Sequence, residues 1–162
     1  MRIVVFSDSH GNLAALSSAL KAQPQAAVFL HLGDGHAEVE YLRALNPGVK
    51  IMYARGNCDW SSHDKDEEML AMGGKKVFFT HGHMYDVKRG VDKLVQRATD
   101  LGADVACFGH THGAMCQRIG QLYLLNPGSV HLPRGGPASY GIVDITPQGG
   151  ISADIMPLQT TQ

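Results

Sequence analysis

Five short apolar runs in this sequence each end in side chains that can bind a metal ion. The runs are rich in β-branched and aromatic residues, which is typical of buried strands. They are Val4–Phe6 followed by Asp8 and His10, Phe29–Leu30 by Asp34, Met52–Tyr53 by Asn57, Phe78–Phe79 by His81, and Cys107–Phe108 by His110 and His112. In open α/β sheets, sites form beyond the carboxyl ends of strands. The pattern therefore predicts an α/β fold with one polar centre.

The order of the expected elements narrows the fold further. Apolar periodicity predicts helices over 13–21 (with Asn12 as N-cap), 37–45 (with Val39, Leu42 and Leu45 inward) and 90–101. Strands are predicted over 2–6, 26–32, 49–54, 67–72, 75–80, 104–108, 114–119, 122–125, 139–145 and 151–156, with a loop at 60–65 and a turn at 126–129. Helices alternate with strands first and hairpins follow, which indicates sheet packed on sheet with helices outside. We expect one domain over 1–158 and a frayed tail over 159–162.

Composition excludes several classes of protein. The chain is 44% hydrophobic and 18% charged, and its net charge of -1 leaves no electrostatic footprint for nucleic acid or an anionic membrane. No apolar run is long enough to span a membrane, and Asp8 comes too early for a signal peptide. Cys58, Cys107 and Cys116 form no CxxC pair, so neither a disulfide framework nor a thiolate zinc site is expected. We expect Cys107 and Cys116 to be buried and the protein to be cytoplasmic.

The seven candidate donors are too many for one tetrahedral ion. Two aspartates, one asparagine and four histidines suit two ions about 3.5–4 Å apart, with one carboxylate bridging them. Oxygen and imidazole donors without thiolate favour Mn, Fe, Zn, Ni or Co over Ca or Mg. If the chain is extended at 110–112, the two imidazoles there point to the same side. Each donor has an ordinary alternative as a cap, a turn residue or a polar surface residue, but the whole set at successive strand ends favours a metal centre.

The same residues resemble a known family. Asp8-Ser9-His10, Gly33-Asp34, Gly56-Asn57-Cys58-Asp59, His81-Gly82-His83 and Gly109-His110-Thr111-His112, in this order, look like the signature of the calcineurin-like metallophosphoesterases. The compact length, the Gly-Asn-Cys-Asp form and Asn126-Pro127-Gly128-Ser129 followed by Pro133-Arg134 are similar to the small bacterial and archaeal phosphodiesterase subfamily.

That resemblance implies a four-layer α-β-β-α sandwich of two mixed sheets flanked by helices. It also implies that Asp8, His10 and His112 hold one divalent ion, that Asn57, His81 and His110 hold a second, and that Asp34 bridges them. Mn²⁺ is the preferred ion in this expectation. The implied activity is hydrolysis of a small phosphodiester by a water or hydroxide shared between the ions.

One position departs from the family pattern. Many members carry a histidine where this chain has Cys58, and that histidine contacts the phosphate. A thiol is a weak donor, so Cys58 is either a catalytic residue or a small packing residue. Asp59, His83, His36 or solvent are the other candidates for the general acid, unless the leaving group needs none. The expected catalytic set is Asp34, Asn57, Cys58 and His83.

Several alternatives stay open at this stage. The same site would suit a phosphomonoesterase or a nucleotide pyrophosphatase, and Arg134 is either a phosphate ligand or a surface residue. A retromer-complex subunit uses the same fold as a non-catalytic scaffold, but all seven ligand positions are filled here, which favours an enzyme. Metal storage or sensing would not need a bridging carboxylate. Strands over 123–125 and 142–143 could provide a sheet edge for a homo-oligomer, although core packing explains them more simply.

Overall fold

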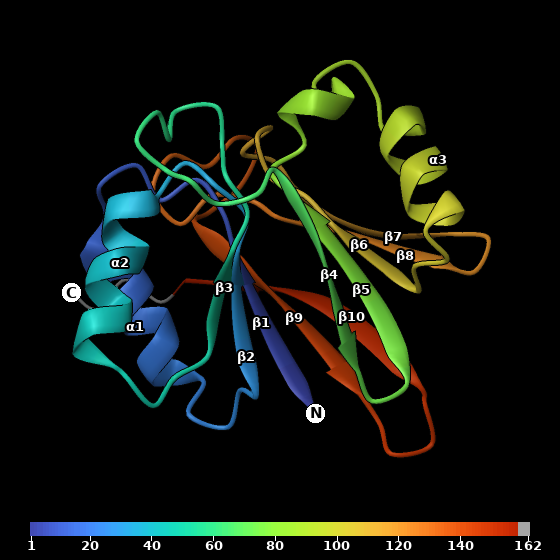
Figure 1. Cartoon of the computed structure of the whole chain (residues 1–162), viewed down its shortest axis with the longest axis horizontal. Helices are drawn as coiled ribbons and strands as arrows, with labels where there is room; N and C mark the ends of the chain where they lie inside the picture. The colour runs from blue at the N-terminus through green and yellow to red at the C-terminus, as the bar shows by residue number, and fades with distance from the viewer. Residues whose placement is uncertain (159–162) are drawn as a thin grey trace.

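Two five-stranded sheets pack face to face in the computed structural model, and helices cover their outer faces (Figure 1). The structure describes residues 1–158, so the tail expected at 159–162 lies outside the described residues. The helices are α1 (Leu13–Ala22), α2 (His36–Leu45) and α3 (Asp92–Asp100), with a 3₁₀ turn η1 (His83–Tyr85). The strands are β1 (Arg2–Phe6), β2 (Val28–His31), β3 (Ile51–Tyr53), β4 (Glu67–Met72), β5 (Lys75–Thr80), β6 (Val105–Cys107), β7 (Ala114–Ile119), β8 (Leu122–Pro127), β9 (Ser139–Ile145) and β10 (Ile151–Pro157).

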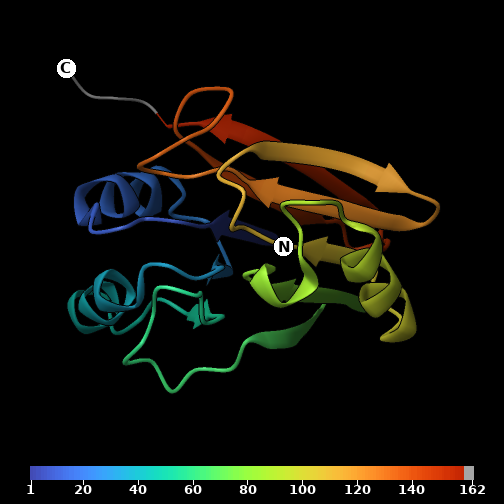
Figure 2. The ribbon, with the colours of Figure 1, turned by 90° about the horizontal axis from the view of Figure 1, so that it is seen from above.

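The topology confirms the expected α/β sandwich of mixed sheets. The strand orders are β10-β9-β1-β2-β3 in the first sheet and β4-β5-β6-β8-β7 in the second. In the first sheet β1, β2 and β3 are parallel, and in the second β5, β6 and β8 are parallel. In each sheet, therefore, the carboxyl ends of several strands lie at the same end of the sheet. Figure 1 shows the loops that follow these strands gathered at the top of the molecule, and Figure 2 looks down on that side.

Alternation along β1 divides its side chains between two cores. Ile3 and Val5 lie in the central core between the sheets, whereas Val4 and Phe6 pack in a second core with residues of α1 and α2. This is the period of two expected of a strand buried on both faces. Asn12 caps α1 as predicted, because its side-chain oxygen accepts a hydrogen bond from the Ala15 amide at 3.0 Å.

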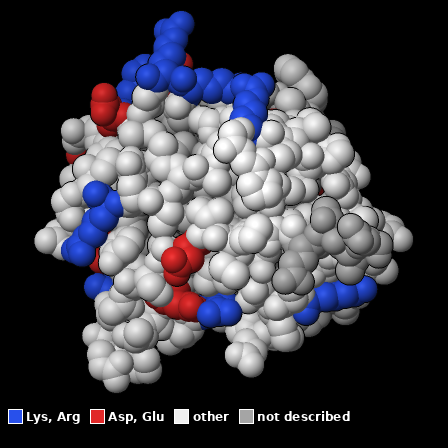
Figure 3. Space-filling view, turned by 180° about the vertical axis from the view of Figure 1, so that it is seen from behind, with Lys and Arg blue, Asp and Glu red and all other residues white. Residues whose placement is uncertain are grey.

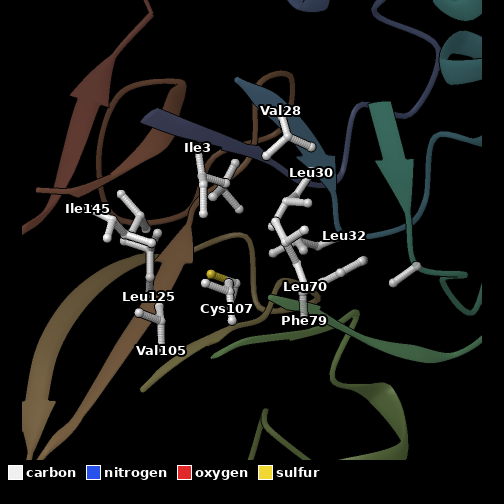
Figure 4. Packing of buried hydrophobic residues seen from close by; sticks show 14 residues of the cluster. Ile3, Val28, Leu30, Leu32, Leu70, Phe79, Val105, Cys107, Leu125 and Ile145 are labelled. Carbon is white, nitrogen blue, oxygen red and sulfur yellow. The ribbon is translucent and has the colours of Figure 1, made fainter. Parts of the chain in front are cut away.

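The second sheet is divided in the same way. Phe79 of β5 enters the central core, and its neighbour Phe78 packs with Leu94 and Ala98 of α3. Figure 4 shows the central core, where side chains from both sheets meet. The labelled members include Ile3 and Leu30 from one sheet and Cys107 and Leu125 from the other. Burial of apolar surface stabilises the fold by roughly 25 cal/mol per Å², so this shared core holds the two sheets in a fixed relation.

Several local expectations are wrong. β8 continues through Pro127, so 126–129 is not wholly a turn, because Asn126 and Pro127 still pair with β7. α3 is shorter than the predicted 90–101, and η1 was not expected. Leu45 is 59% exposed rather than inward, since it is the last residue of α2. Cys116 is exposed on β7, an edge strand, whereas Cys107 is buried as expected.

The two strands considered for self-association are not edges. Residues 123–125 lie in β8, between β6 and β7, and residues 142–143 lie in β9, between β10 and β1. Their backbone groups pair within the sheets, so neither strand can add a second copy through an edge. Core packing, the simpler explanation, is confirmed for Leu124, Leu125 and Val143, which have no exposed surface.

The surface agrees with the small net charge. On the face seen from behind, most side chains are neither acidic nor basic, and Lys and Arg are spread around its margin (Figure 3). Among the described residues, no helix combines the length and the apolar character that crossing a membrane requires.

Candidate metal centre

One group of donor atoms comes from the loops after β1 and β6. The Oδ1 atom of Asp8 lies 3.2 Å from Nε2 of His112 and 3.8 Å from Nε2 of His10. The two Nε2 atoms are 3.3 Å apart. Two ligands about 2.1 Å from one ion would be separated by roughly 3.0 Å at a right angle and about 3.4 Å at the tetrahedral angle. These three donors therefore have the spacing of ligands to a single ion.

A second group is built around His81, which follows β5. Its Nε2 atom lies 3.1 Å from Oδ1 of Asn57 and 3.1 Å from Nδ1 of His110. The Oδ2 atom of Asp34 is 3.5 Å from the same nitrogen and 3.8 Å from Nε2 of His10. Asp34 thus lies between the two groups, and one of its oxygens faces both.

The orientation of the imidazoles suits a bound cation. Nδ1 of His81 donates to the Leu32 carbonyl at 2.6 Å, and Nδ1 of His112 donates to the Leu132 carbonyl at 2.7 Å. A ring that donates through Nδ1 turns an Nε2 lone pair to the centre, which is the usual support of a metal-binding histidine. The Oδ1 atom of Asp8 is buried and has no hydrogen-bond partner among the described residues. A divalent ion would satisfy that buried oxygen, so the residues present fit the metal that their chemistry implies.

Protonation states also favour cation binding. Burial raises the pKa of Asp8, but the close approach of His112, the charge of His81 and the hydrogen bond from Ser7 outweigh it, so the net pKa is lowered. Burial and the nearby His81 lower the pKa of His110 to about 4. The adjacent Asp8 carboxylate raises the pKa of His112. A carboxylate and a neutral imidazole, the forms that bind metal, therefore predominate at Asp8 and His110 near pH 7.

The donor residues share an unusual backbone conformation. Asp8, His10, Asp34, His110 and His112 have φ of 55°, 39°, 58°, 66° and 61°. Only one further non-glycine residue in the described chain, Asp86, has positive φ. Such residues cost about 1–3 kcal/mol each and persist where the surrounding structure enforces them. The expectation of an extended chain at 110–112 is therefore wrong, and the left-handed turns send its two imidazoles to different donor groups.

Close approach at this centre requires glycine at several positions. A Cβ at Gly109 would lie 1.9 Å from the Ser7 hydroxyl oxygen, and a Cβ at Gly56 would lie 2.1 Å from Oδ1 of Asp34. These contacts are far below van der Waals distance, so the glycines in these motifs allow the backbone to approach the carboxylates.

Asp59 has a role that differs from the proton donor considered above. Its carboxylate accepts hydrogen bonds from the amides of Asp34, Gly35, His36 and Gly56 at 2.7–3.2 Å and from the Tyr53 hydroxyl at 2.5 Å. Burial alone would raise the pKa of Asp59. Hydrogen bonds from the Tyr53 hydroxyl and the backbone amides lower it by more, so the net pKa is below the usual value. Asp59 is therefore a carboxylate that joins the loops after β2 and β3 and positions Asp34. A general acid at this residue does not fit the geometry.

Two more buried polar residues position the centre and were missed as site residues. Ser129 donates to the Asp8 carbonyl at 2.8 Å, and its hydroxyl accepts from the amides of His131 and Leu132. Asn126 donates to the Gly109 carbonyl at 3.1 Å and to the Thr111 hydroxyl at 3.0 Å. The sequence contained a signal that could have identified both residues, because they belong to the Asn-Pro-Gly-Ser motif. That motif supports the loops that carry the donors.

The remaining candidates lie around the centre. The Cys58 amide donates to Oδ1 of Asp34 at 2.8 Å, and the side chain is exposed, so the interpretation as a packing residue is wrong. Burial and Asp34 raise the pKa of Cys58 to about 11. His83 lies beside the second group, with its ring centroid 5.4 Å from that of His81, and burial and the charge of His81 lower its pKa. Nδ1 of His36 lies 3.3 Å from Oδ2 of Asp64, and Arg134 lines a cavity together with His112.

Comparison with known proteins agrees with this geometry. A family model described as the calcineurin-like phosphoesterase superfamily domain matches residues 1–148. The chain belongs to this superfamily. Its members are phosphoesterase hydrolases that use divalent metals, so the resemblance carried by the five motifs is confirmed.

Relatives of this chain occur in Bacillus subtilis and Escherichia coli. It is 37% identical over 135 residues to the probable metallophosphoesterase YsnB of Bacillus subtilis, covering 83% of this chain and 78% of that one. It is 32% identical over 171 residues to the phosphodiesterase YfcE of Escherichia coli, covering 89% of this chain and 88% of that one.

Solved structures share its fold. A predicted phosphoesterase of Streptococcus pneumoniae superposes with a TM-score of 0.77 at 26% identity, over 96% of each chain. Vps29 of Chaetomium thermophilum superposes with a TM-score of 0.75 at 19% identity, over 96% of this chain and 94% of that one. The second likeness shows the fold alone.

Replacement of Tyr53 by Phe tests the positioning role of Asp59. We expect the metal-free variant to be about 1–2 kcal/mol less stable at pH 7, because a buried hydrogen bond to a carboxylate is lost. The pKa of Asp59 is lowered in the folded state, so its stabilisation is complete above the unfolded value of about 3.9 and is lost as pH falls through the folded value. The difference should therefore shrink in acid.

Urea unfolding in the presence of a chelator, at pH 7 and again in acid, measures both effects. Tyr41→Phe is the matched control, because Tyr41 is 54% exposed on α2. Equal stability of Tyr53→Phe and wild type at pH 7 would contradict the assignment, as would a difference that does not depend on pH.

Proposed function

We propose that this protein hydrolyses a small phosphodiester at a centre of two divalent metal ions. The observation that supports the proposal most strongly is the position of Asp34. Its Oδ2 atom lies within 3.8 Å of donors from both groups, so one carboxylate can serve two ions. Asp8, His10 and His112 would hold one ion, and Asn57, His81 and His110 the other. Mn²⁺ is our first choice of ion, because the donors are oxygen and imidazole without thiolate.

When bound, two such ions would activate water as a nucleophile near neutral pH and offset negative charge on the phosphoryl oxygens. The chain's own groups would orient the substrate. Asn57 is exposed at the rim of the centre, and its side-chain nitrogen donates only to the Cys58 sulfur, at 3.3 Å. That nitrogen is available to a phosphate oxygen, a much better acceptor than a thiol sulfur.

Neither Cys58 nor His83 is a strong general acid. The Cys58 thiol has a pKa of about 11 and donates weakly, and the lowered pKa of His83 leaves it neutral near pH 7. General acid catalysis is most effective when the pKa of the acid is close to the working pH. We therefore propose that the leaving group departs with little proton donation from the protein. Cys58 and His83 would contact the substrate and shape the cavity around the leaving group.

Two alternatives share the same centre. A phosphomonoesterase or nucleotide pyrophosphatase would need the same metal ligands, and the diester is preferred here because the relative YfcE is named a phosphodiesterase. A non-catalytic scaffold has no use for seven clustered donors, five of them held in strained backbone conformations, so the left-handed residues at the centre favour an enzyme.

The choice between diester and monoester can be tested directly. Metal-stripped protein should be inactive, and added Mn²⁺ should restore hydrolysis of bis(p-nitrophenyl) phosphate in preference to p-nitrophenyl phosphate. A preference for the monoester would keep the centre but change the function to phosphatase. If Mn²⁺ binds and neither ester is cleaved, the enzymatic proposal fails for these substrates and the scaffold becomes the better explanation.

Replacement of Asp34 by Asn tests the shared carboxylate. We expect turnover to fall at least 10³-fold, since an amide offers one neutral oxygen where two ions need an anionic bridge. Bound Mn²⁺, measured by elemental analysis, should fall from two ions per chain towards one. Asp154→Asn is the control, because Asp154 is exposed on β10. Near-normal activity in Asp34→Asn would exclude the two-metal interpretation.

Position 58 provides a test of the missing acid. Methyl phenyl phosphate and methyl p-nitrophenyl phosphate differ only in how good the leaving group is. Wild type should strongly prefer the p-nitrophenyl ester, and Cys58→His should reduce that preference about tenfold or more by supplying a proton donor. Cys58→Ser, which keeps a weak donor, should retain the wild-type preference for the p-nitrophenyl ester. If the histidine variant shows an unchanged preference, proton donation at this position is irrelevant to the reaction.

A further inference from the structure

Trp60 stands apart from the other large apolar residues near the centre. It is the single tryptophan of the chain, and it is 93% exposed. A solvent-exposed indole contributes almost nothing to the core, so stability of the fold does not explain it. An isolated exposed apolar residue is ordinary on a protein surface. Its meaning here depends on what surrounds it.

The loop that carries Trp60 is held firmly on both sides. The Arg55 amide donates to the Lys65 carbonyl at 2.9 Å, which closes the loop at its base. Asp59, immediately before the indole, is fixed by its network of backbone bonds, and the Ser62 amide donates to the Asp59 carbonyl at 3.1 Å. Ser62 is buried, and its hydroxyl donates to Asp64 at 2.7 Å. The indole is thus presented from a supported backbone, which reduces the entropy that binding must overcome.

Trp60 lies at the side of the second donor group. Trp60 lines a cavity of about 270 Å³ together with Asn57, Arg55 and His83. Oδ1 of Asn57 lies 3.1 Å from Nε2 of His81, so this cavity opens directly beside that donor group. A phosphoester whose phosphate occupies the centre would extend one of its ester groups past Asn57 towards the indole.

The polar walls of this cavity suit a ring rather than an alkyl chain. The Arg55 guanidinium is held at 2.8–2.9 Å by Asp66, so its N–H groups have a fixed position. Such groups can meet the edge of a ring while the indole covers its face. The two other cavities that reach the centre contain no Phe, Tyr or Trp: one is lined by His10, His36, Glu38 and Cys58 among others, and one by His112, Arg134 and Pro137 among others.

From this geometry we propose that Trp60 binds a planar aromatic ring carried by an ester group of the substrate. This inference rests on the proposed function and adds the substrate class, an aryl or nucleoside phosphoester. Trp60 would be a specificity-determining residue, since it contacts the substrate away from the phosphorus. Stacking of a ring on an aromatic side chain gives about a tenfold gain in affinity, which is within the range of measured effects.

Binding of phenyl phosphate and ethyl phosphate to the Mn²⁺-loaded protein tests this proposal. We expect calorimetry to show that phenyl phosphate binds about tenfold tighter. Because Trp60 is the only tryptophan, phenyl phosphate should also change the protein's indole fluorescence, and ethyl phosphate should change it much less. Adenosine 5′-monophosphate is the third probe. Tighter binding than phenyl phosphate would indicate a nucleobase, and weaker binding a small aryl group.

Variants separate stacking from general effects. Trp60→Leu should bring the phenyl-to-ethyl affinity ratio close to one, whereas Trp60→Phe should keep most of it. Tyr41→Leu, at an exposed aromatic residue on α2, is the matched control and should keep the wild-type ratio. An unchanged ratio in Trp60→Leu, with metal-dependent binding of ethyl phosphate intact, would overturn this inference alone. If neither phosphate binds in the presence of Mn²⁺, the proposed function fails as well.

Discussion

The packing of two sheets against one another is the constraint on which the centre depends. Each donor group contains residues from both sheets: His112 follows a strand of the second sheet and meets Asp8 from the first, and His81 meets Asn57 in the same way. The central core sets the distance between the sheet edges, and hydrogen bonds across the gap complete the alignment. The His110 amide donates to Asp8 at 3.1 Å, and the His81 ring donates to the Leu32 carbonyl. A rigid core is therefore a requirement of the site as well as of stability.

The left-handed residues show how the fold uses this rigidity. Five donors occupy a backbone region that non-glycine residues rarely adopt. In a loose loop they would relax to ordinary conformations and the donor atoms would separate. Buried polar side chains prevent this, because Asp59 holds the loop of Asp34, and Ser129 and Asn126 hold the loops of Asp8 and His110. Energy from packing and hydrogen bonds thus offsets strain that serves the arrangement of ligands.

The surroundings of the centre are the basis of the substrate preference that we propose. A weakly donating thiol and a neutral imidazole beside the centre favour substrates with good leaving groups, and an exposed indole on a fixed loop favours a ring. Cys58 and Trp60 lie in the loop after β3, whereas His83 begins η1 after β5. The sandwich supplies a common scaffold for the metal ligands, and the loop after β3 gives this chain its own chemistry.

The sequence by itself determined most of the elements and all seven candidate donors, because strand periodicity and the chemistry of donor side chains are local properties. It also determined the family, since five motifs in a fixed order carry that information. The family resemblance already implied how the donors divide between two ions, but only the tertiary structure supplied the geometry that separates them. His110 and His112 are two residues apart, yet left-handed turns place them in different groups. The sequence also did not predict that Asp59 is a hydrogen-bond acceptor or that β8 and β9 lie inside their sheets. Nor did it predict the exposure of Cys58, Cys116 and Trp60. Each of them depends on contacts between segments far apart in the chain, and local pattern does not encode those contacts.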